Sequence, residues 1–487
     1  MSPKIYILIS IIICQYCIEK SSVQMSQNLI IRNATIVTSQ DQFRKDIRIR
    51  DGKIVEIDNK INRRDNQDQV IDAEGLFVLP GGIDPHVHLT LPESVPEGHR
   101  WVDDLISGSK AAFAGGITTV GNISFPELGE TPLATLEREE KTVHAQAMVD
   151  VILHPVIEQP SKFVLDEIPI MAAQGNTSIK IFMVTRTFES HYSDYLEVLK
   201  IAGKVGIISM IHCEDLSSIS SATNRLISEG KSSLRYYAES RPVESEVLAT
   251  KRAVEMCEIT GAPVYIVHLS SKQALEVCEQ AYTRSLPVYV ETRPLYLHFT
   301  KERFLEPDGA LFVGQPPLRE SEDMAYLWNG LANGSIHTIG TDHAPWTRKQ
   351  KLDPSLNITN LRPGVNNLQV MLPLLYSEGV VKKKITLEQF VALTSTNAAI
   401  LFGLFPRKGT IAVGSDADLV FWDPDLNRKI RGNELFSRAG FSVFDGMEVP
   451  GWPVITIRRG EVVYQNGEIT ARPGSGQLLK RKGTQSL

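Results

Sequence analysis

Two histidines that lie two positions apart are the first residues in this chain whose types and spacing suggest chemistry. His86 and His88 belong to the stretch 81–89, which follows the apolar run 76–79 and Pro80. Side chains alternate between the faces of a β-strand, so both imidazoles are expected to point the same way. Such a pair at the end of a strand suits a divalent metal, although two hydrogen-bonded histidines near a turn would give the same pattern.

Further residues of ligand type follow apolar runs later in the chain. They are Lys180, His212, His268 and Asp342. A lone histidine at a strand end is more often simply hydrogen-bonded, and a lone aspartate before His-Ala-Pro more often caps a turn. Lys180 is harder to explain in this way, because an ammonium buried in an apolar strand is costly unless it is paired or altered. The coincidence of all these residues in one chain favours a shared site.

Together these residues predict a binuclear metal site. An ammonium group cannot bind a cation, but a lysine carbamylated by CO₂ presents two oxygens that can bridge two metals. Two metals about 3.5–4 Å apart bind a hydroxide and polarise a carbonyl group. Asp342 could hold that hydroxide, take its proton and pass it to a leaving nitrogen. The chemistry that this arrangement indicates is the hydrolysis of an amide-like bond.

Strand–helix alternation between about residues 79 and 405 would position these side chains. Amphipathic stretches such as 101–114, 193–205, 243–260 and 272–284 separate the strand candidates. Those candidates are 118–123, 148–155, 178–183, 207–213, 264–269, 288–292 and 338–341. About eight strands over roughly 300 residues suit an α/β fold of the TIM-like (β/α)₈ barrel type, whose catalytic residues lie at the C-terminal ends of the strands. An open doubly wound sheet ranks second, because no Gly-x-Gly-x-x-Gly loop follows an early strand.

Both ends of the chain consist of short strands. The N-terminal part alternates apolar and polar residues around Asp51-Gly52, a strong hairpin signal. The same pattern returns at 409–413, 418–422, 454–458 and 461–465. We therefore predict one small β-sandwich domain formed from both chain ends, residues 25–79 and 406–470, with the barrel over residues 80–405. Residues 471–487, rich in Gly, Lys and Ser, are predicted to be a flexible C-terminal tail.

Residues 1–24 form a signal-like or upstream extension. Lys4 precedes the apolar run 5–14, but no clear cleavage site of small residues follows, and the run is too short to span a bilayer comfortably. Met25 is an alternative functional start. The five cysteines form neither a paired metal motif in the globular part nor a disulfide framework. A cytoplasmic location is therefore expected, with a secreted or periplasmic one as the alternative if the apolar segment works as a signal.

The composition is that of an ordinary globular protein. Of 487 residues, 42% are hydrophobic and 22% are charged, and 51 basic against 57 acidic residues give a net charge of -6. Nothing in this balance points to nucleic acid or to an acidic membrane surface. The expected partner is a small-molecule substrate, with no nucleic acid and no stable membrane span.

Several of these motifs resemble the amidohydrolase superfamily, and within it the cyclic amidases dihydropyrimidinase and D-hydantoinase, with allantoinase and dihydroorotase more distant. The resemblance covers about residues 29–467. It rests on the stretch 80–88, on Gly-Gly-Ile-Thr-Thr at 115–119, on Ser-Ile-Lys-Ile-Phe at 178–182, on His212, on Val-His at 267–268, on Gly-Thr-Asp-His-Ala-Pro at 340–345 and on 409–419. The resemblance implies a metal-dependent barrel, a small β-sandwich formed from both ends, and a homotetramer or homodimer.

The resemblance also implies a role for each residue. His86, His88 and Asp342 would hold one metal, and His212 and His268 the other. Lys180, as a carbamate, would bridge the two divalent ions, which are expected to be zinc. Asp342 and Lys180 are the predicted catalytic residues. The predicted contacts with the imide-like edge of the substrate ring are Thr292, Pro363 and Gly364.

Two positions depart from the pattern of the family. Dihydroorotases usually carry arginine two residues after the second histidine, where this chain has Thr90. Dihydropyrimidinases and hydantoinases usually carry a catalytic tyrosine five residues after the lysine, where this chain has Thr185. We predict that the adjacent Arg186 replaces the phenol as a donor or binds an anionic group of the substrate. A surface arginine without function is the alternative, and His191 and Tyr192 are other candidates in the same loop.

The function that these patterns favour is a metal-dependent hydrolase that opens a dihydropyrimidine or hydantoin ring with a metal-bound hydroxide. An allantoinase or another cyclic-imide hydrolase is the alternative within the class. A non-catalytic scaffold protein related to dihydropyrimidinase is the alternative of another class. The complete set of predicted metal ligands argues against the scaffold.

Overall fold

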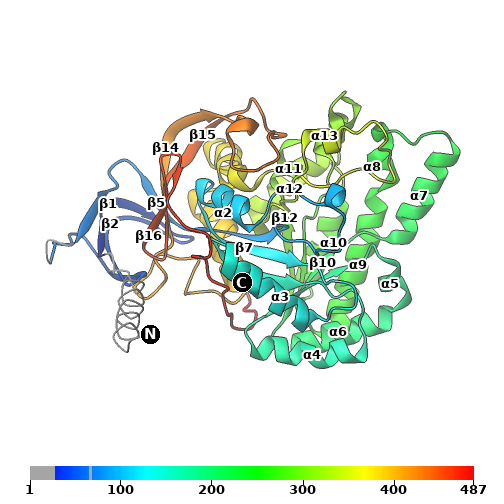
Figure 1. The fold of residues 1–487 in the computed structure, drawn as a ribbon, viewed down its shortest axis with the longest axis horizontal. Coiled ribbons are helices and arrows are strands. Elements are labelled where there is room, and N and C mark those ends of the chain that lie inside the picture. The colour runs from blue at the N-terminus through cyan, green and yellow to red at the C-terminus, as the bar shows by residue number, and fades with distance from the viewer. Residues whose placement is uncertain (1–27, 65–67) are drawn as a thin grey trace, which may run out of the picture.

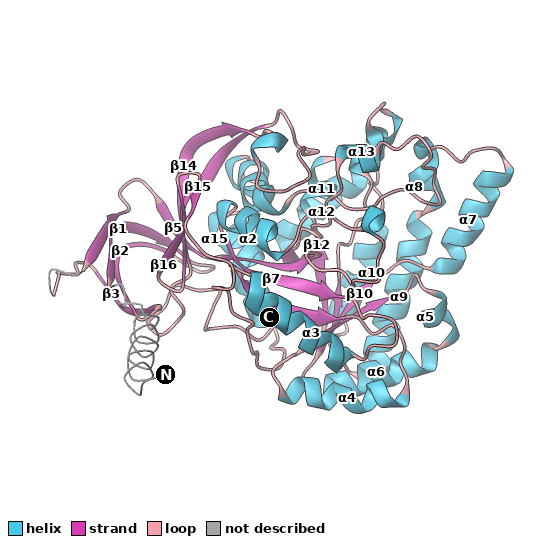
Figure 2. Ribbon diagram, viewed as in Figure 1, coloured by secondary structure: helices cyan, strands magenta, loops and turns pink. Residues whose placement is uncertain are grey.

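The computed structural model describes residues 28–64 and 68–487. The signal-like segment 1–24 and the alternative start Met25 lie outside the described residues. The chain folds into a small β-rich part, on the left in Figure 1, and a larger part in which helices surround strands (Figures 1 and 2). The largest hydrophobic cluster fills the larger part, and a separate cluster packs within the small one.

The small part is a nine-stranded sheet that combines both ends of the chain. Its N-terminal strands are β1 (Leu29–Val37), β2 (Gln42–Arg50), β3 (Lys53–Asp58), β4 (Gln69–Asp72) and β5 (Phe77–Pro80). Its C-terminal strands are β14 (Leu419–Lys429), β15 (Glu448–Arg458), β16 (Glu461–Gln465) and β17 (Glu468–Ile469). β5 pairs antiparallel with β14, so the two ends of the chain share hydrogen bonds at that junction. Asp51 and Gly52 both have left-handed φ values, 52° and 75°, and form the predicted hairpin between β2 and β3.

The larger part is built on parallel strands. One sheet of three strands contains β6 (Gly82–Val87), β7 (Ile117–Ser124) and β8 (Asp150–Pro155). A second sheet of five contains β9 (Ser178–Phe182), β10 (Ile208–His212), β11 (Val264–Ile266), β12 (Val288–Thr292) and β13 (Thr338–Ile339). Most of these strands are buried at every residue, as expected of parallel strands that are covered on both faces. The predicted α/β fold with parallel sheets is confirmed.

Helices connect these strands and cover them (Figure 2). The longer ones are α2 (Leu105–Ala114), α3 (Pro132–Gln146), α4 (Lys162–Ala173), α6 (Tyr192–Lys204), α7 (Leu216–Ser228), α9 (Val243–Thr260), α10 (Lys272–Tyr282) and α12 (Ser321–Asn333). The shorter ones are α5 (Arg186–Ser190), α8 (Tyr237–Ser240), α11 (Pro294–His298), α13 (Arg348–Lys351), α14 (Met371–Leu375), α15 (Leu387–Val391) and α16 (Asn397–Leu401). No helix in the described ranges is long and apolar enough to cross a membrane.

A buried ion cluster joins the two parts of the molecule. Nζ of Lys408 lies 2.8 Å from Asp150 at the start of β8, and it also pairs with Asp418, which precedes β14. The second oxygen of Asp418 accepts a hydrogen bond of 2.7 Å from the backbone N–H of Arg459. Buried charges need partners to offset their lost hydration. The motif 409–419 therefore contributes to the contact between the small sheet and the larger part.

The C-terminal segment corrects the prediction of a flexible tail over residues 471–487. Its backbone pairs with β8, where Val151 N–H donates to Gln477 and Leu479 N–H donates to Val151, at 2.8 and 2.9 Å. Arg481 is buried, and its guanidinium donates to Oγ of Ser178 at 2.9 Å. The C-terminal segment contains few apolar residues, and such a composition suggests disorder. It cannot reveal that backbone groups of β8 are available to pair with this segment.

Replacing Arg481 with methionine should destabilise the protein, because buried acceptors at Ser178 and Leu153 lose their charged donor. A loss of about 1–3 kcal/mol is expected in the free energy of unfolding measured in urea. Lys480→Met, at the exposed neighbouring position, should leave that free energy unchanged. Equal stability of the two variants would show that the segment packs without contributing to the fold.

Candidate metal centre and active-site cavity

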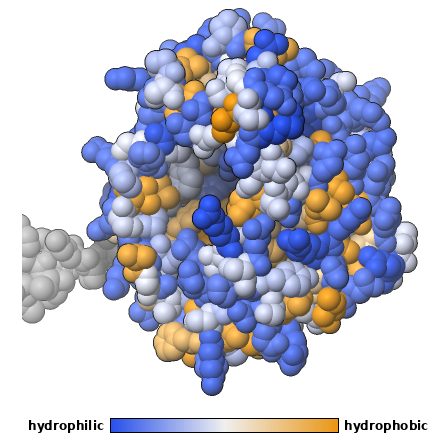
Figure 3. Space-filling model, turned by 90° about the vertical axis from the view of Figure 1, so that its right-hand side faces the viewer, coloured by the Kyte–Doolittle hydropathy of each residue, from blue (hydrophilic) through white to orange (hydrophobic). Residues whose placement is uncertain are grey.

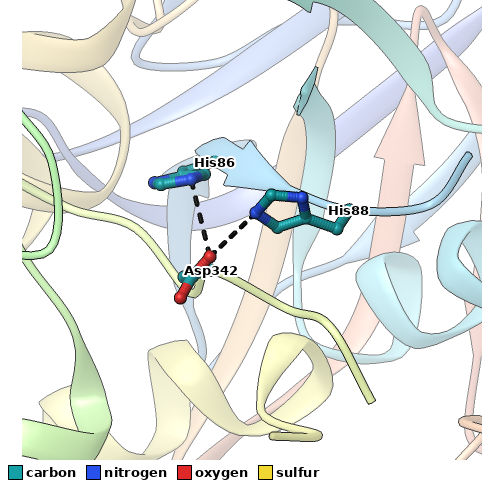
Figure 4. Close-up of side chains that lie close together, drawn as sticks. All are labelled: His86, His88 and Asp342. Carbon is teal, nitrogen blue, oxygen red and sulfur yellow. Dashed lines mark hydrogen bonds and ion pairs between the residues drawn. The ribbon is translucent and has the colours of Figure 1, made fainter. Parts of the chain in front are cut away.

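Two histidines and an aspartate converge at the C-terminal ends of the first and last parallel strands. His86 and His88 lie at the end of β6, and Asp342 lies three residues after β13. Oδ1 of Asp342 is 2.9 Å from Nε2 of His88 and 3.5 Å from Nε2 of His86, as Figure 4 shows. His86 and His88 are buried and 13% of the Asp342 side chain is exposed. The ligand atoms of the three residues lie within 4.8 Å of one another. Two imidazoles and a carboxylate at this spacing suit a divalent metal ion.

The backbone around Asp342 is held in an uncommon conformation. Its φ is 50°, in the left-handed region that a non-glycine residue rarely adopts. Its N–H donates to the carbonyl of His86 at 2.8 Å, and His88 N–H donates to the carbonyl of His343 at 2.9 Å. These bonds tie the segment after β13 to the end of β6. Strained residues held in this way are concentrated at functional sites.

A second group of ligand-type residues comes from neighbouring strands. His212 ends β10 and His268 follows β11, and Nδ1 of His212 lies 3.0 Å from Nε2 of His268. Lys180 lies in β9, in register with Met210 on β10. Its side chain is fully buried, and its Nζ has no hydrogen-bond partner among the described residues. Burial lowers the pKa of Lys180 to about 8.

Buried carboxylates orient two of the imidazoles from behind. Nδ1 of His86 lies 2.9 Å from Glu291, and Nε2 of His212 lies 2.9 Å from Glu214. The opposite nitrogens, Nε2 of His86 and Nδ1 of His212, are thereby left to face the ligand groups. Burial by itself would raise the pKa of Glu214, but Arg241 and His212 hold that pKa at about 2. Burial raises the pKa of Glu291 to about 7, so only Glu214 is fully ionised at neutral pH. A hydrogen-bonded carboxyl group behind each ring fixes its orientation.

The imidazoles are in the form that binds metal. Burial lowers the pKa of His212, and it lowers the pKa of His86 and of His268 well below the usual value. The nearby Lys180 disfavours protonation of all three rings. Because a neutral imidazole offers a lone pair and an imidazolium does not, the rings are ready to coordinate a cation at neutral pH.

One cavity of about 360 Å³ contacts both groups of ligand-type residues. Figure 3 shows a hollow in the middle of the face that lies to the right in Figure 1. One wall of the cavity is aromatic and is formed by Trp101, Phe125, Phe182 and Tyr195. Polar side chains at its edge come from Glu158, Gln159, Thr185, Thr187 and Gln315. A mostly apolar pocket with a few polar groups beside a candidate metal centre is the usual form of a small-molecule active site.

The predicted substrate contacts are only partly brought to this cavity. Pro363 and Gly364 line it. Thr292 is buried beside it without lining it, and its hydroxyl donates to the carbonyl of Leu269 at 2.9 Å. The backbone of Gly364 has φ of 116°, and a Cβ there would lie 2.1 Å from the carbonyl oxygen of Ala344. Only glycine can therefore occupy that position without a shift of the backbone.

The position of Arg186 corrects the prediction that it acts on the substrate. Thr185 lines the cavity and caps α5, where its hydroxyl accepts from Phe188 N–H at 3.2 Å. Arg186 is the first residue of that helix and is exposed, along a separate shallow depression with Glu189. His191 is exposed and Tyr192 does not line the cavity. Arg186 directly follows Thr185, which lines the cavity, but α5 begins at Arg186 and its side chain points toward solvent.

Sequence reasoning missed several functional residues. Glu214, Glu291 and Arg293 are all buried, and the guanidinium of Arg293 donates to Oδ2 of Asp342. Glu291 lies at the end of an apolar strand, as Lys180 lies within one. A charged residue in an apolar strand is the same signal that identified Lys180, so Glu291 could have been predicted from the sequence in the same way. Arg293 lies beyond its strand and carries no such signal.

The site combines imidazoles and carboxylates at the ends of parallel strands with a mostly apolar cavity. This combination is typical of metal-dependent enzymes that act on small molecules. The chain belongs to the amidohydrolase family, whose profile matches residues 77–463. It is 38% identical over 457 residues to a D-hydantoinase from Geobacillus stearothermophilus, covering 93% of this chain and 96% of that protein. The resemblance drawn from the motifs is confirmed.

Solved structures agree with the sequence comparison. A crystal structure of a D-hydantoinase matches with a TM-score of 0.89 at 37% identity, covering 93% of this chain and 99% of the other. The crystal structure of dihydropyrimidinase from Brevibacillus agri NCHU1002 matches with a TM-score of 0.88 at 33% identity, covering 94% and 99%. The likeness therefore extends over nearly the whole length of both relatives.

Replacing Glu214 with glutamine should weaken metal binding, because His212 loses the charged acceptor that orients its ring. Loss of such a partner typically weakens binding by about 10–100-fold. Zinc retained after dialysis against graded chelator concentrations measures the change, and Glu189→Gln on the exposed face of α5 is the matched control. Equal zinc retention in the two variants would remove Glu214 from the metal centre.

Proposed function

We propose that this protein is a metal-dependent cyclic amidase that opens a dihydropyrimidine or hydantoin ring. The observation that carries the proposal is the single cavity lined by His86, His88, His212, His268 and Asp342. The likeness to D-hydantoinases and a dihydropyrimidinase over nearly the whole chain supports the same substrate class. An allantoin-type ring is the second candidate, and a non-catalytic scaffold is disfavoured because every predicted metal ligand is present and all but the partly exposed Asp342 are buried.

The residues present fit a pair of divalent metal ions, for which zinc is the proposed identity. His86, His88 and Asp342 would hold one ion, and His212 and His268 the other. Lys180 would bridge them as a carbamate, which gives its unpartnered, fully buried Nζ a function. A pKa of about 8 supports this assignment, because CO₂ reacts with the free amine. When bound, the two ions would activate water and polarise the carbonyl group of the substrate.

Asp342 is the proposed proton carrier. Burial alone would raise the pKa of its carboxyl group, but Arg293 and the histidines hold that pKa well below the usual value. The carboxylate is therefore ionised and able to accept a proton, which it would pass to the leaving nitrogen of the opened ring. Backbone carbonyl groups at Pro363 and Gly364, which line the cavity, are proposed to hold the imide-like edge of the ring. The aromatic wall would pack the ring substituent and exclude water.

The arrangement of the parallel strands supports a closed barrel. We infer that strands β6 to β13 close into a (β/α)₈ barrel. Bridges between Val156 and Lys180 and between Val87 and His343 link the two parallel sheets at both junctions, which supports closure. The curved nine-stranded sheet is proposed to be the small β-sandwich domain, residues 25–79 and 406–470, beside a barrel over 80–405.

The oligomeric state and the location complete the proposal. A homodimer or homotetramer is what the family resemblance implies, and light scattering on the purified protein tests it. A cytoplasmic location is supported by Cys213, Cys257 and Cys278, which are buried and free.

The substrate class can be tested with a panel of rings. The zinc-loaded protein should open dihydrouracil or a 5-substituted hydantoin, and a chelator should abolish the activity reversibly. Dihydroorotate should be at least about tenfold poorer in kcat/KM, because an unpaired buried carboxylate costs about 1–3 kcal/mol. No arginine or lysine lines the described cavity to pair with that carboxylate. Opening of allantoin alone would establish the second candidate, and opening of no ring would favour the scaffold.

Lys180→Ala should lose the metal pair and the activity together, since the bridging group disappears. Lys180→Arg should fail as well, because a guanidinium does not form the carbamate. Metal content by mass spectrometry and a carbamate signal in ¹³C NMR after incubation with labelled bicarbonate are the measurements. Lys200→Ala, at an exposed position on α6, is the control. Two metals and full turnover in Lys180→Ala would remove the lysine from the site.

A further inference from the structure

Arg293 places a buried cation next to a candidate metal ligand. Its side chain has no exposed surface, and its Nη1 donates to Oδ2 of Asp342. Its Nε and Nη2 have no hydrogen-bond partner among the described residues. A buried guanidinium with unused donors is costly for stability. Its ion pair with Asp342 is therefore better explained by function than by folding.

The guanidinium of Arg293 is closely packed where it meets Asp342. Arg293 stands between the end of β12 and the start of α11. Its guanidinium carbon lies 5.3 Å from the centre of the Tyr296 ring, whose hydroxyl donates to the carbonyl of Pro316 at 2.6 Å. Gly314 is also close, since a Cβ there would lie 3.4 Å from both Nη atoms. An aromatic ring and a glycine backbone thus leave the guanidinium little room to move.

The two oxygens of Asp342 are consequently not equivalent. Oδ1 faces Nε2 of His88 at 2.9 Å and Nε2 of His86 at 3.5 Å, whereas Oδ2 is taken by Arg293. The backbone of Asp342 is in the left-handed region, so local conformational preference does not favour this placement. A planar guanidinium is suited to fixing the orientation of a carboxylate.

We propose that Arg293 is a positioning residue that restricts Asp342 to one metal-facing oxygen, Oδ1, which must also accept the proton. Without Arg293, the carboxylate is free to rotate and to present both oxygens to a metal. The inference rests on the proposed function for its kinetic consequence, but the coordination of Asp342 is measurable without any substrate.

The test uses Arg293→Met and Arg293→Lys in the full-length protein. In Arg293→Met, kcat should fall by about 10²-fold, as expected when a reacting group is displaced by about 1 Å. KM should stay within about twofold of the parent value, since the ring contacts are unchanged. Zinc should be retained at least as strongly against a chelator, because a neighbouring cation has been removed. Arg293→Lys should not restore kcat, because an ammonium keeps the charge and loses the planar fork.

The cobalt-substituted protein provides a readout that is independent of turnover. If Asp342 offers a second oxygen in Arg293→Met, the coordination number of the ion rises and its visible d–d absorption weakens. Arg48→Met is the matched control, because Arg48 is also buried and ion-paired, 3.0 Å from Asp68, but lies in the small sheet. It should lower thermal stability to a similar extent without changing kcat, KM or the cobalt spectrum.

Three results would overturn the inference. They are an unchanged cobalt spectrum in Arg293→Met, full kcat in Arg293→Lys, and joint loss of zinc, fold and activity in both variants. The last result would assign Arg293 a purely structural role. If the parent protein opens no ring but the cobalt spectrum changes as expected, the proposed function fails and the positioning role stands. If the parent opens rings and the spectrum does not change, the positioning role alone fails.

Discussion

The buried carboxylate of Asp84 is the constraint on which the site depends. It accepts hydrogen bonds of 3.1 Å from the backbone N–H groups of His86 and Thr341, and so joins β6 to the segment after β13. Burial raises the pKa of Asp84 to about 7, while these donors favour the ionised form. His86 is one of the two residues that it holds, and Asp342 directly follows the other, Thr341. A shift at Asp84 would therefore move ligands from the first and the last parallel strand together.

The balance of buried charge explains why the site remains ready for a cation. Imidazoles and an amine that are removed from water lose protons, because burial penalises their charged forms. Carboxylates behind the imidazoles keep the rings in one tautomer. The result is a set of uncharged imidazoles beside the ionised Asp342 and an amine whose proton is held less tightly than usual. Such a set has little reason to exist in the core unless a metal completes it, since each member costs stability on its own.

Two residues beside the candidate metal centre, Thr185 and Arg293, affect how a substrate would be handled there. Thr185 lines the cavity where relatives usually carry a phenol, and Arg293 holds the outer oxygen of Asp342. Thr185 offers no phenol to a substrate, and Arg293 holds the carboxylate that is proposed to carry the proton.

The sequence by itself determined the residues that lie at strand ends. His86, His88, Lys180, His212, His268 and Asp342 could be identified because each follows or interrupts an apolar run, which is a local signal. The combination of both chain ends in one sheet could also be predicted, because both ends consist of short strands of alternating apolar and polar residues. Only the tertiary structure decided which arginine reaches the centre. Arg186 is next to the right strand but begins a helix and faces solvent.

Arg293 and the C-terminal segment show the same limit. Arg293 lies 49 positions from Asp342 in sequence, and their contact exists only because β12 and β13 are neighbours in the sheet. Residues 477–479 look disordered by composition, yet they pair with β8 through backbone groups that every residue possesses. Local patterns report which residues a strand buries. They do not report which distant backbone or side chain meets it, because that depends on how the elements pack.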